Sequence, residues 1–298
     1  MLSKILVPLD GSDLAESVLP YVIELAKRSS AEVLLLIAVS DVALWDASAT
    51  VIAWEREQEL ARGYIESQGE ALTSATVNVR TKVVRGDPAR AIARAVDEEG
   101  IDLVALSTHG RSGITRWLLG SVAGRVLETT AVPVLTVRPP EKRPNGAIHR
   151  ILVPLDGSTL AESILPLVEK LAADHEATIV LMQSVPPVAA YSGFEYAAPT
   201  TLNKILGDMQ AESRRYLSEI SDKLREKGLT VEAVTTGSLP AEAIISTADD
   251  HAVDLIALAT HGRSGLGRVV LGSIADSVVR RSHLPCLLVH PNEQTASP

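Results

Sequence analysis

The sequence is poor in aromatic residues and in cysteine, and it has no long uninterrupted apolar run. Phe, Trp and Tyr together make up 3% of the 298 residues, so the core must be built from Ala, Val, Leu and Ile. An aliphatic core of this kind favours parallel sheets covered by helices. The single cysteine, Cys286, excludes an internal disulfide framework, and we expect it to be a buried small hydrophobe in a strand. Without a run of about 18 apolar residues, no transmembrane helix is expected.

Positive charge is also scarce. The formal net charge is −9 and there is no run of Lys or Arg, so neither nucleic acid nor an anionic membrane surface is an expected partner. Pro8 and Asp10 come too early for a signal peptide, and we expect a cytoplasmic protein. The sequence has no Gly-x4-Gly-Lys-Ser/Thr and no Gly-x-Ser-x-Gly segment, which argues against a P-loop NTPase and against a hydrolase nucleophile elbow.

A long internal repeat sets the domain organisation. The segment ILVPLDGS at 5–12 returns at 151–158, and THGRSG at 108–113 returns at 260–265. A repeat of this length corresponds to a whole domain rather than to a solenoid unit. The offset between the copies grows from 146 positions at Asp10 to 152 further on, so the second copy has about six extra residues, which we place near 186–199.

The boundary between the copies is a charged, proline-rich segment without apolar periodicity, as expected of a linker. We predict a first domain over 1–138, a linker over 139–148, a second domain over 149–292 and a polar tail over 293–298.

Each copy alternates short apolar runs with amphipathic segments. In the first copy short apolar runs predict strands at Lys4–Leu9, Glu32–Val39, Asp102–Ser107 and Pro133–Val137, and alternating apolar and polar residues predict a further strand at Val77–Val84. Helices are expected near the starts of the intervening segments, where Asp13 with Glu16, and Thr159 with Glu162, resemble capping boxes. This order predicts an α/β fold of two doubly wound domains, each with a five-stranded parallel sheet covered on both faces.

The segment from Ser107 to Ser121 is the strongest candidate for a binding site. It connects the end of a strand to the start of a helix, the place where open α/β sheets bind ligands. Its glycines permit a close approach of the backbone, and the unpaired N–H groups of the following helix attract phosphate. Arg111 and Arg116 supply positive charge nearby. The alternative is that the glycines only form tight turns, and the second copy is not independent support because duplication alone can preserve a pattern.

Two acidic residues and two histidines are further candidates. Asp10 and Asp156 follow the first strand of each copy, where a carboxylate can bind ribose hydroxyls, hold a phosphate-bound metal through water, or cap the turn before Gly-Ser. These roles are compatible. His109 and His261 are interpreted as residues that hold a turn rather than as acid–base groups, because no partnering nucleophile is evident. The aromatic residues after each second strand are expected to pack over a ligand base, in the core or at an interface: Trp45, Trp54, Tyr191, Phe194 and Tyr196.

The whole chain resembles a tandem universal stress protein. The adenine-nucleotide-binding branch of that family carries Gly-x2-Gly-x9-Gly-Ser/Thr. The later part of this motif is matched by Gly110-x9-Gly120-Ser121 and by Gly262-x9-Gly272-Ser273. Ser107 and Ala259 replace the first glycine of the motif, and both are small enough to keep part of the close approach.

The resemblance implies flavodoxin- or Rossmann-like domains that bind ATP, with Mg²⁺, in the crevice of each sheet. It places adenine near Pro8, Leu9 and Val39 and near Pro154, Leu155 and Val185, and it places the ribose at Asp10 or Asp156. The remaining cofactor-binding residues that it implies are Ser107, His109, Gly110, Arg111, Ser112, Gly113, Gly120, Ser121 and Val122, and in the second copy Ala259, His261, Gly262, Arg263, Ser264, Gly265, Gly272, Ser273 and Ile274. No catalytic residue and no metal-ligating side chain is assigned.

The leading hypothesis is therefore an ATP-binding stress-response protein that senses or sequesters nucleotide and regulates a protein partner, with slow hydrolysis left open. The alternative is a nucleotide-independent interaction module of the same fold. A ligase of the ATP-pyrophosphatase type is disfavoured, because Leu9-Asp-Gly-Ser12 stands where such enzymes carry a phosphate loop. Family members pair through their last strands, which implies an internal pseudo-dimer of the two domains, and a homodimer of the tandem chain is left open.

Overall fold

A computed structural model describes residues 2–40, 47–109, 119–139, 145–187, 199–260 and 271–290. The chain divides into two compact units, residues 1–147 and 148–298, which repeat the same order of strands and helices. The predicted α/β fold is confirmed in both units. How the last strands of the two domains pair stays a prediction.

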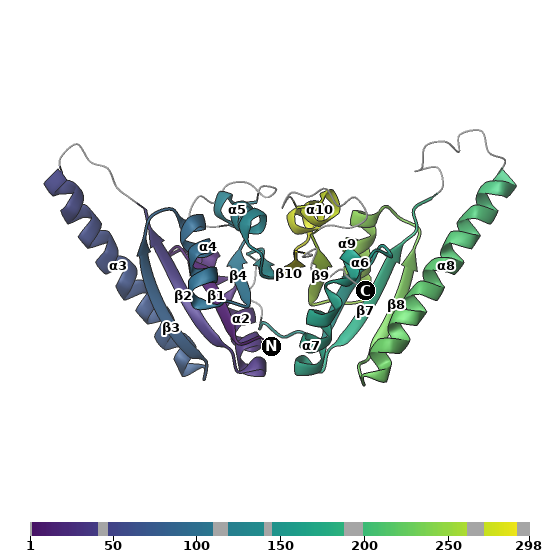
Figure 1. The fold of residues 1–298 in the computed structure, drawn as a ribbon, viewed down its shortest axis with the longest axis horizontal. Coiled ribbons are helices and arrows are strands. Elements are labelled where there is room, and N and C mark those ends of the chain that lie inside the picture. The colour runs from purple at the N-terminus through teal and green to yellow at the C-terminus, as the bar shows by residue number, and fades with distance from the viewer. Residues whose placement is uncertain are drawn as a thin grey trace. The chain divides into compact units, whose positions relative to one another are not determined.

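The first unit is a parallel sheet with helices on both faces (Figure 1). Within the described residues its strand order is β3-β2-β1-β4-β5. The strands are β1 (Lys4–Leu9), β2 (Glu32–Val39), β3 (Asn78–Arg85), β4 (Leu103–Ser107) and β5 (Val134–Val137). The helices are α1 (Asp13–Glu16), α2 (Leu19–Ser29), α3 (Ala47–Ser74), α4 (Pro88–Glu99) and α5 (Ser121–Thr129).

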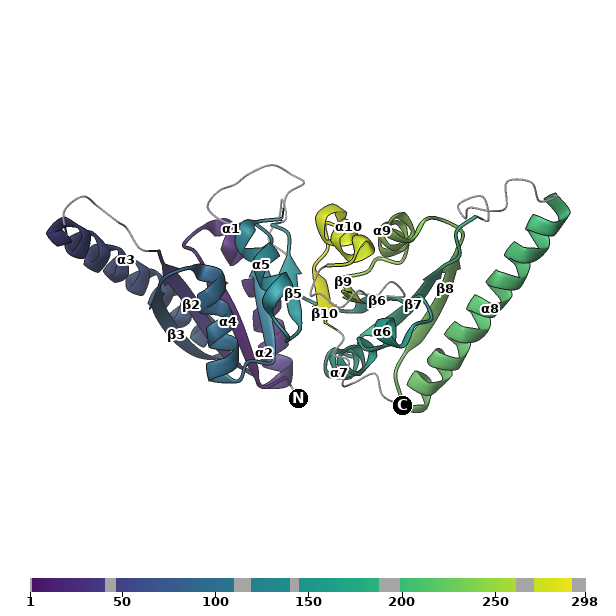
Figure 2. The ribbon, with the colours of Figure 1, turned by 45° about the horizontal axis from the view of Figure 1, so that its top comes forward.

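The second unit repeats this arrangement (Figure 2). Over the described part of the chain its strand order is β10-β9-β6-β7-β8, again all parallel. The strands are β6 (Arg150–Pro154), β7 (Thr178–Ser184), β8 (Val231–Thr236), β9 (Leu255–Ala259) and β10 (Cys286–Val289). The helices are α6 (Thr159–Glu162), α7 (Leu165–His175), α8 (Pro199–Glu226), α9 (Pro240–Asp250) and α10 (Ser273–Arg281).

The strand order creates a switch point between β1 and β4. The chain steps outward from β1 to β2 and β3, then returns to add β4 and β5 on the other side of β1. Because parallel crossovers are right-handed, this reversal puts α2 and α3 on one face and α4 and α5 on the other. The carboxyl ends of β1 and β4 diverge at this point, and open α/β sheets bind their ligands there. The second unit has the same switch point between β6 and β9.

The apolar runs form the strands that the sequence predicts. In the first unit β1 and β2 have the predicted bounds, and the other three strands lie within about one residue of prediction, which is normal scatter for element ends. Ile5, Leu6 and Val7 are fully buried in β1, as expected for a strand covered on both faces. Among the described residues, no helix combines the length and the apolar character needed to cross a bilayer.

The capping prediction for the first helix of each unit is wrong by one residue. Ser12, not Asp13, is the N-cap of α1, and its Oγ accepts a hydrogen bond from the backbone N–H of Ala15 at 3.2 Å. Ser158 replaces Thr159 in the same way at the start of α6. The serine has the extended backbone of a capping residue, whereas the following residue is already helical and cannot turn its side chain back to the N–H.

Gly146 fits tightly against the first unit. Its φ of +77° lies in the left-handed region, and a Cβ there would overlap the carbonyl oxygen of Pro20 in α2. We expect Gly146→Ala to lower the free energy of unfolding of the first unit by about 1–3 kcal/mol, because backbone strain and steric overlap add. Chemical denaturation of the full chain measures this loss.

Gly100→Ala is the matched control. Gly100 has a φ of +64° but no atom within 4 Å of its Cβ position, so only the conformational cost remains, about 1 kcal/mol. Equal losses in the two variants would show that the overlap with Pro20 contributes nothing.

Candidate functional site

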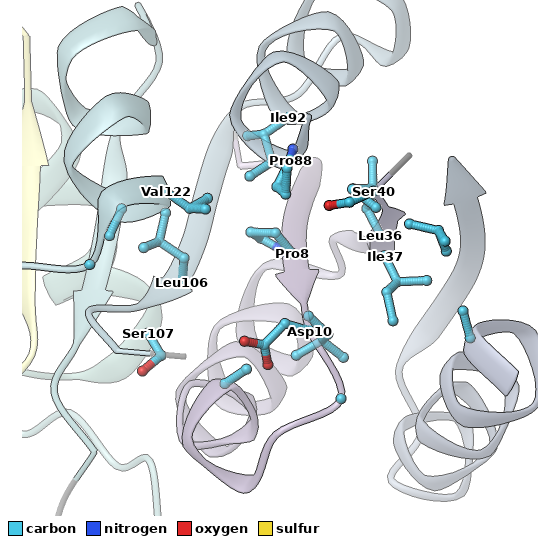
Figure 3. A pocket seen from close by; sticks show the side chains of 18 of the residues that line it. Pro8, Asp10, Leu36, Ile37, Ser40, Pro88, Ile92, Leu106, Ser107 and Val122 are labelled. Atoms are coloured by element: carbon cyan, nitrogen blue, oxygen red, sulfur yellow. The ribbon is translucent and has the colours of Figure 1, made fainter. Parts of the chain in front are cut away.

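A cavity of about 860 Å³ opens at the carboxyl ends of β1 and β4 in the first unit (Figure 3). This volume is within the range of small-molecule sites. Pro8 at the end of β1 lies below Pro88 and Ile92 of α4, and the carboxylate of Asp10 is turned toward the side on which Ser107 lies (Figure 3). The cavity therefore coincides with the switch point of the sheet.

The structure brings together nine of the residues that the sequence nominates. Those lining the cavity are Pro8, Leu9, Asp10, Val39, Ser107, His109, Gly120, Ser121 and Val122. In the second unit Pro154, Leu155, Asp156, Val185, Ala259, Gly272, Ser273 and Ile274 occupy the same places along the fold. Their roles in binding stay predictions.

Several nominated residues lie outside the described part of the chain. In the glycine loops these are Gly110, Arg111, Ser112, Gly113 and Arg116, and His261, Gly262, Arg263, Ser264 and Gly265. Of the aromatic residues, Trp45, Tyr191, Phe194 and Tyr196 also lie outside it. Trp54 is described, and the guanidinium of Arg85 stacks 5.0 Å from the centre of its ring.

The glycine loop begins and ends at the same point. The backbone N–H of Gly120 donates to the carbonyl of Thr108 at 2.9 Å, so the start of α5 is fixed to the end of β4. Thr108 is only 4% exposed. Gly272 and Thr260 form the same bond at 2.8 Å in the second unit. A Cβ on Gly120 would stand 3.0 Å from the Thr108 carbonyl oxygen, which explains the glycine at this position.

The start of α5 presents backbone donors to the cavity. Gly120 is the N-cap of α5, and as a glycine it has no side chain to cap the helix. The first hydrogen bond inside the helix runs from the Gly124 N–H to the Gly120 carbonyl at 2.8 Å. The N–H groups of Ser121, Val122 and Ala123 come before that bond, and all three residues line the cavity. Unpaired N–H groups and the helix dipole together favour an anionic group such as phosphate.

Asp10 organises the turn that follows β1. Its Oδ1 accepts hydrogen bonds from the Ser12 backbone N–H at 3.0 Å and from the Ser12 hydroxyl at 2.6 Å. Asp156 and Ser158 repeat this arrangement at 2.9 and 2.6 Å. The turn role of the aspartate is thus observed in both units. A ligand contact is compatible with it, because Asp10 also lines the cavity.

His109 is held by its neighbours. Its Nδ1 lies 2.9 Å from the Thr108 hydroxyl, and its backbone N–H donates to Ser107 Oγ at 3.3 Å. These bonds agree with the interpretation of a histidine that holds the turn. Cys286 is 1% exposed in β10, and burial raises the pKa of its thiol to about 12. The expectation of a buried small hydrophobe in a strand is confirmed.

Helix α4 forms one wall of the cavity, and its start is fixed by Asp87. The Asp87 carboxylate accepts from the Arg90 N–H at 3.0 Å and from Arg125 Nη1 of α5 at 2.8 Å. The hydrogen bond from Arg125 lowers the pKa of Asp87, so this carboxylate stays charged. Because Pro88 and Ile92 line the cavity, the link between α4 and α5 sets the position of that wall.

Sequence reasoning missed the wall that α3 contributes. Its lining residues are Glu57, Leu60, Ala61 and Tyr64. The Tyr64 hydroxyl donates to Glu16 Oε1 of α1 at 3.1 Å, and Tyr216 donates to Glu162 in the second unit at 2.9 Å. The signal was available, because Tyr64 and Tyr216 recur at the later offset of the two copies, 152 positions apart.

The bond between Tyr64 and Glu16 ties α3 to α1. Burial and the adjacent Glu16 carboxylate raise the pKa of Tyr64 far above its ordinary value, so the phenol remains a donor. We expect Tyr64→Phe to lower the free energy of unfolding by about 1 kcal/mol, because Glu16 loses the bond from the phenol while it keeps the bond from Gln68, at 3.0 Å. A double-mutant cycle with Glu16→Ala measures the coupling. Additive losses would mean that the two side chains do not stabilise one another.

The fold and the cavity define a tandem, doubly wound α/β protein with a cavity at the switch point of the sheet in its first unit. The sequence profile of the universal stress protein family matches residues 1–138 and 147–290. The chain therefore belongs to the universal stress protein family.

Individual relatives agree with this assignment. A universal stress protein of Methanocaldococcus jannaschii is 34% identical over 146 residues, which are 47% of this chain and 84% of the relative. One from Mycobacterium tuberculosis is 22% identical over 260 residues, covering 84% of this chain and 83% of the relative. The crystal structure of a universal stress protein from Archaeoglobus fulgidus has a TM-score of 0.74 at 20% identity and covers 99% of this chain and 98% of its own. This last similarity concerns the fold.

Proposed function

We propose that the chain binds ATP, with Mg²⁺ carried by the phosphates, in the crevice of its first unit. It then acts in the stress response by sensing nucleotide and regulating a protein partner. The observation that carries the proposal is the cavity of about 860 Å³ whose lining includes both the carboxylate of Asp10 and the start of α5.

The two ends of the cavity suit the two ends of a nucleotide. Backbone N–H groups at Ser121 to Ala123 match phosphate oxygens, and the hydrogen bond from Gly120 to Thr108 fixes the start of the helix that carries them. Ile37, Leu60 and Ala61 give the opposite end an apolar lining, which suits the faces of a purine. Membership in the universal stress protein family supports the same assignment.

The local contacts favour binding over turnover. Among the described residues around the cavity, Asp10 and His109 are the groups nominated from sequence that could move protons. The first accepts two hydrogen bonds from Ser12, and the second shares one with Thr108. A general base must reach the attacking water, and groups engaged in turns are poorly placed for that task. We therefore expect phosphate release from ATP to be slow or absent.

The test is to identify the nucleotide that the purified protein carries. Denaturation followed by liquid chromatography and mass spectrometry is expected to release an adenine nucleotide, and titration of nucleotide-free protein with Mg-ATP should saturate the first unit. ATP should also raise the melting temperature in proportion to the logarithm of its concentration. Protein that carries no nucleotide and binds none would instead favour the interaction module, with Ser107 and Ala259 marking a lost motif.

A further inference from the structure

The two units keep the same residues at the end of the crevice assigned to ribose and phosphate. The N-cap glycine of the last helix is followed by serine in both, as Gly120-Ser121 and Gly272-Ser273. The aspartate after the first strand bonds to a serine in both. Whatever binds in the second unit is therefore expected to carry the same kind of anionic group as the ligand of the first.

The residues that correspond to the opposite end of the first unit's cavity differ in the second unit. In the first unit β2 and α3 line the cavity with four apolar side chains: Ile37, Ala38, Leu60 and Ala61. The strand registers and the repeat offset place four hydrogen-bonding side chains at the same positions of β7 and α8: Gln183, Ser184, Glu212 and Ser213. At two other positions the second unit is less polar: Glu57 corresponds to Met209, and Ser107 corresponds to Ala259. The additional polar groups of the second unit are therefore concentrated where β7 faces α8.

These polar groups are only partly satisfied within the protein. Ser213 is 4% exposed, and its hydroxyl lies 3.1 Å from that of Thr235, a pair that leaves one hydroxyl hydrogen unused. Gln183 stands beside Thr235 in the β7–β8 ladder, and its Oε1 is buried without a hydrogen-bond partner. The Ser184 hydroxyl donates to the Ser238 carbonyl and is already occupied. A buried acceptor without a donor is destabilising, and a ligand that supplies the donor removes that cost.

We propose that the crevice of the second unit binds a guanine nucleotide, whereas that of the first binds an adenine nucleotide. This inference rests on the proposed function. Guanine carries two adjacent donors, N1–H and the N2 amino group, beside the O6 acceptor. The unpaired Gln183 Oε1 can accept from one of these donors, and the carboxylate of Glu212, an exposed residue of α8, can accept from the other. Adenine has one donor group on this edge, the N6 amino group, beside the N1 acceptor, and would leave one of the two acceptors unpaired.

We expect the second unit to discriminate between nucleotides more strongly than the first, because its lining is more polar. A site built from hydrogen-bonding groups rejects a ligand that leaves them unpaired, whereas an apolar wall discriminates weakly between similar rings. We therefore expect GTP to bind the second unit at least about tenfold more tightly than ATP does. The first unit, with Ile37 and Leu60, is expected to prefer ATP by a smaller factor.

The test uses the full chain and assigns each ligand to a unit. Calorimetric titrations with Mg-GTP and Mg-ATP give the affinities, and photolabelling with 8-azido-GTP and 8-azido-ATP, followed by peptide mass spectrometry, shows which unit is labelled. The triple variant Gln183→Ile, Glu212→Leu, Ser213→Ala should lose the GTP preference of the second unit. Ser218→Ala, an exposed position on the same helix, is the control and should keep it.

A second variant keeps the test decisive if the triple variant does not fold. Ile37→Gln, Leu60→Glu, Ala61→Ser transfers the polar end to the first unit and should shift its labelling toward 8-azido-GTP. Equal binding of ATP and GTP by the second unit, or a GTP preference that survives the triple variant, overturns the inference and leaves the proposed function standing. Failure of both nucleotides to bind either unit overturns the two together.

Discussion

Gly120→Ala is expected to weaken the binding of ATP to the first unit by at least about tenfold, which corresponds to a loss of about 1.4 kcal/mol. The φ of Gly120 is −58°, so alanine meets no backbone strain. The effect comes from crowding: the new Cβ stands 3.0 Å from the Thr108 carbonyl oxygen, and the start of α5 must shift to relieve the contact. The N–H groups that we assign to phosphate shift with it. Calorimetric titration of the full chain with Mg-ATP measures the change.

Gly124→Ala is the matched control for this prediction. Gly124 lies in the same helix, and its Cβ would meet only the Leu119 side chain, at an ordinary 3.6 Å. Replacing a glycine inside a helix stabilises the helix by about 0.5–1 kcal/mol and leaves the N-terminus where it is. ATP affinity should therefore be unchanged in Gly124→Ala. An equal loss of affinity in both variants, or in neither, would refute the phosphate site at the start of α5.

The sequence allowed the sheet to be predicted closely because the central strands are short, continuous apolar runs, whereas the edge strand β3 alternates apolar and polar residues. Burial on both faces requires such runs in β1 and β2, and turn residues mark where they stop. Because the two copies share the segment ILVPLDGS, the strands and helices predicted for the first unit apply to the second as well. The N-cap was misplaced by one residue because Ser12 and Asp13 are both good capping residues, and only the backbone at Ser12 decides between them.

The part of the site that sequence reasoning missed comes from α3. Leu60 and Tyr64 lie some fifty positions from Asp10 and belong to no motif, and only the packing of α3 on β2 and β3 brings them to the cavity. The family motif describes the phosphate end alone. Ile37 and Gln183 belong to no motif either. Only the registers of β2 and β7 show that the two residues occupy the same position in the two units.

Asp10→Asn is expected to weaken ATP binding by the first unit roughly 10- to 100-fold, because a hydrogen bond to a charged group contributes about 1.5–3 kcal/mol. The amide keeps an oxygen that can accept from Ser12, so the turn and the free energy of unfolding should change little. Affinity and stability measured on the same protein therefore separate the ligand role of Asp10 from its role in the turn.

Ser12→Ala supplies the opposite case. It removes the hydroxyl that donates to Asp10 at 2.6 Å and that accepts from the Ala15 N–H, but it leaves the carboxylate charge in the crevice. We expect a loss of about 1 kcal/mol in the free energy of unfolding with a smaller effect on ATP affinity than Asp10→Asn has. If Asp10→Asn binds ATP as tightly as the unaltered chain, the aspartate serves the turn alone. The ribose contact would then have to come from another residue of the cavity.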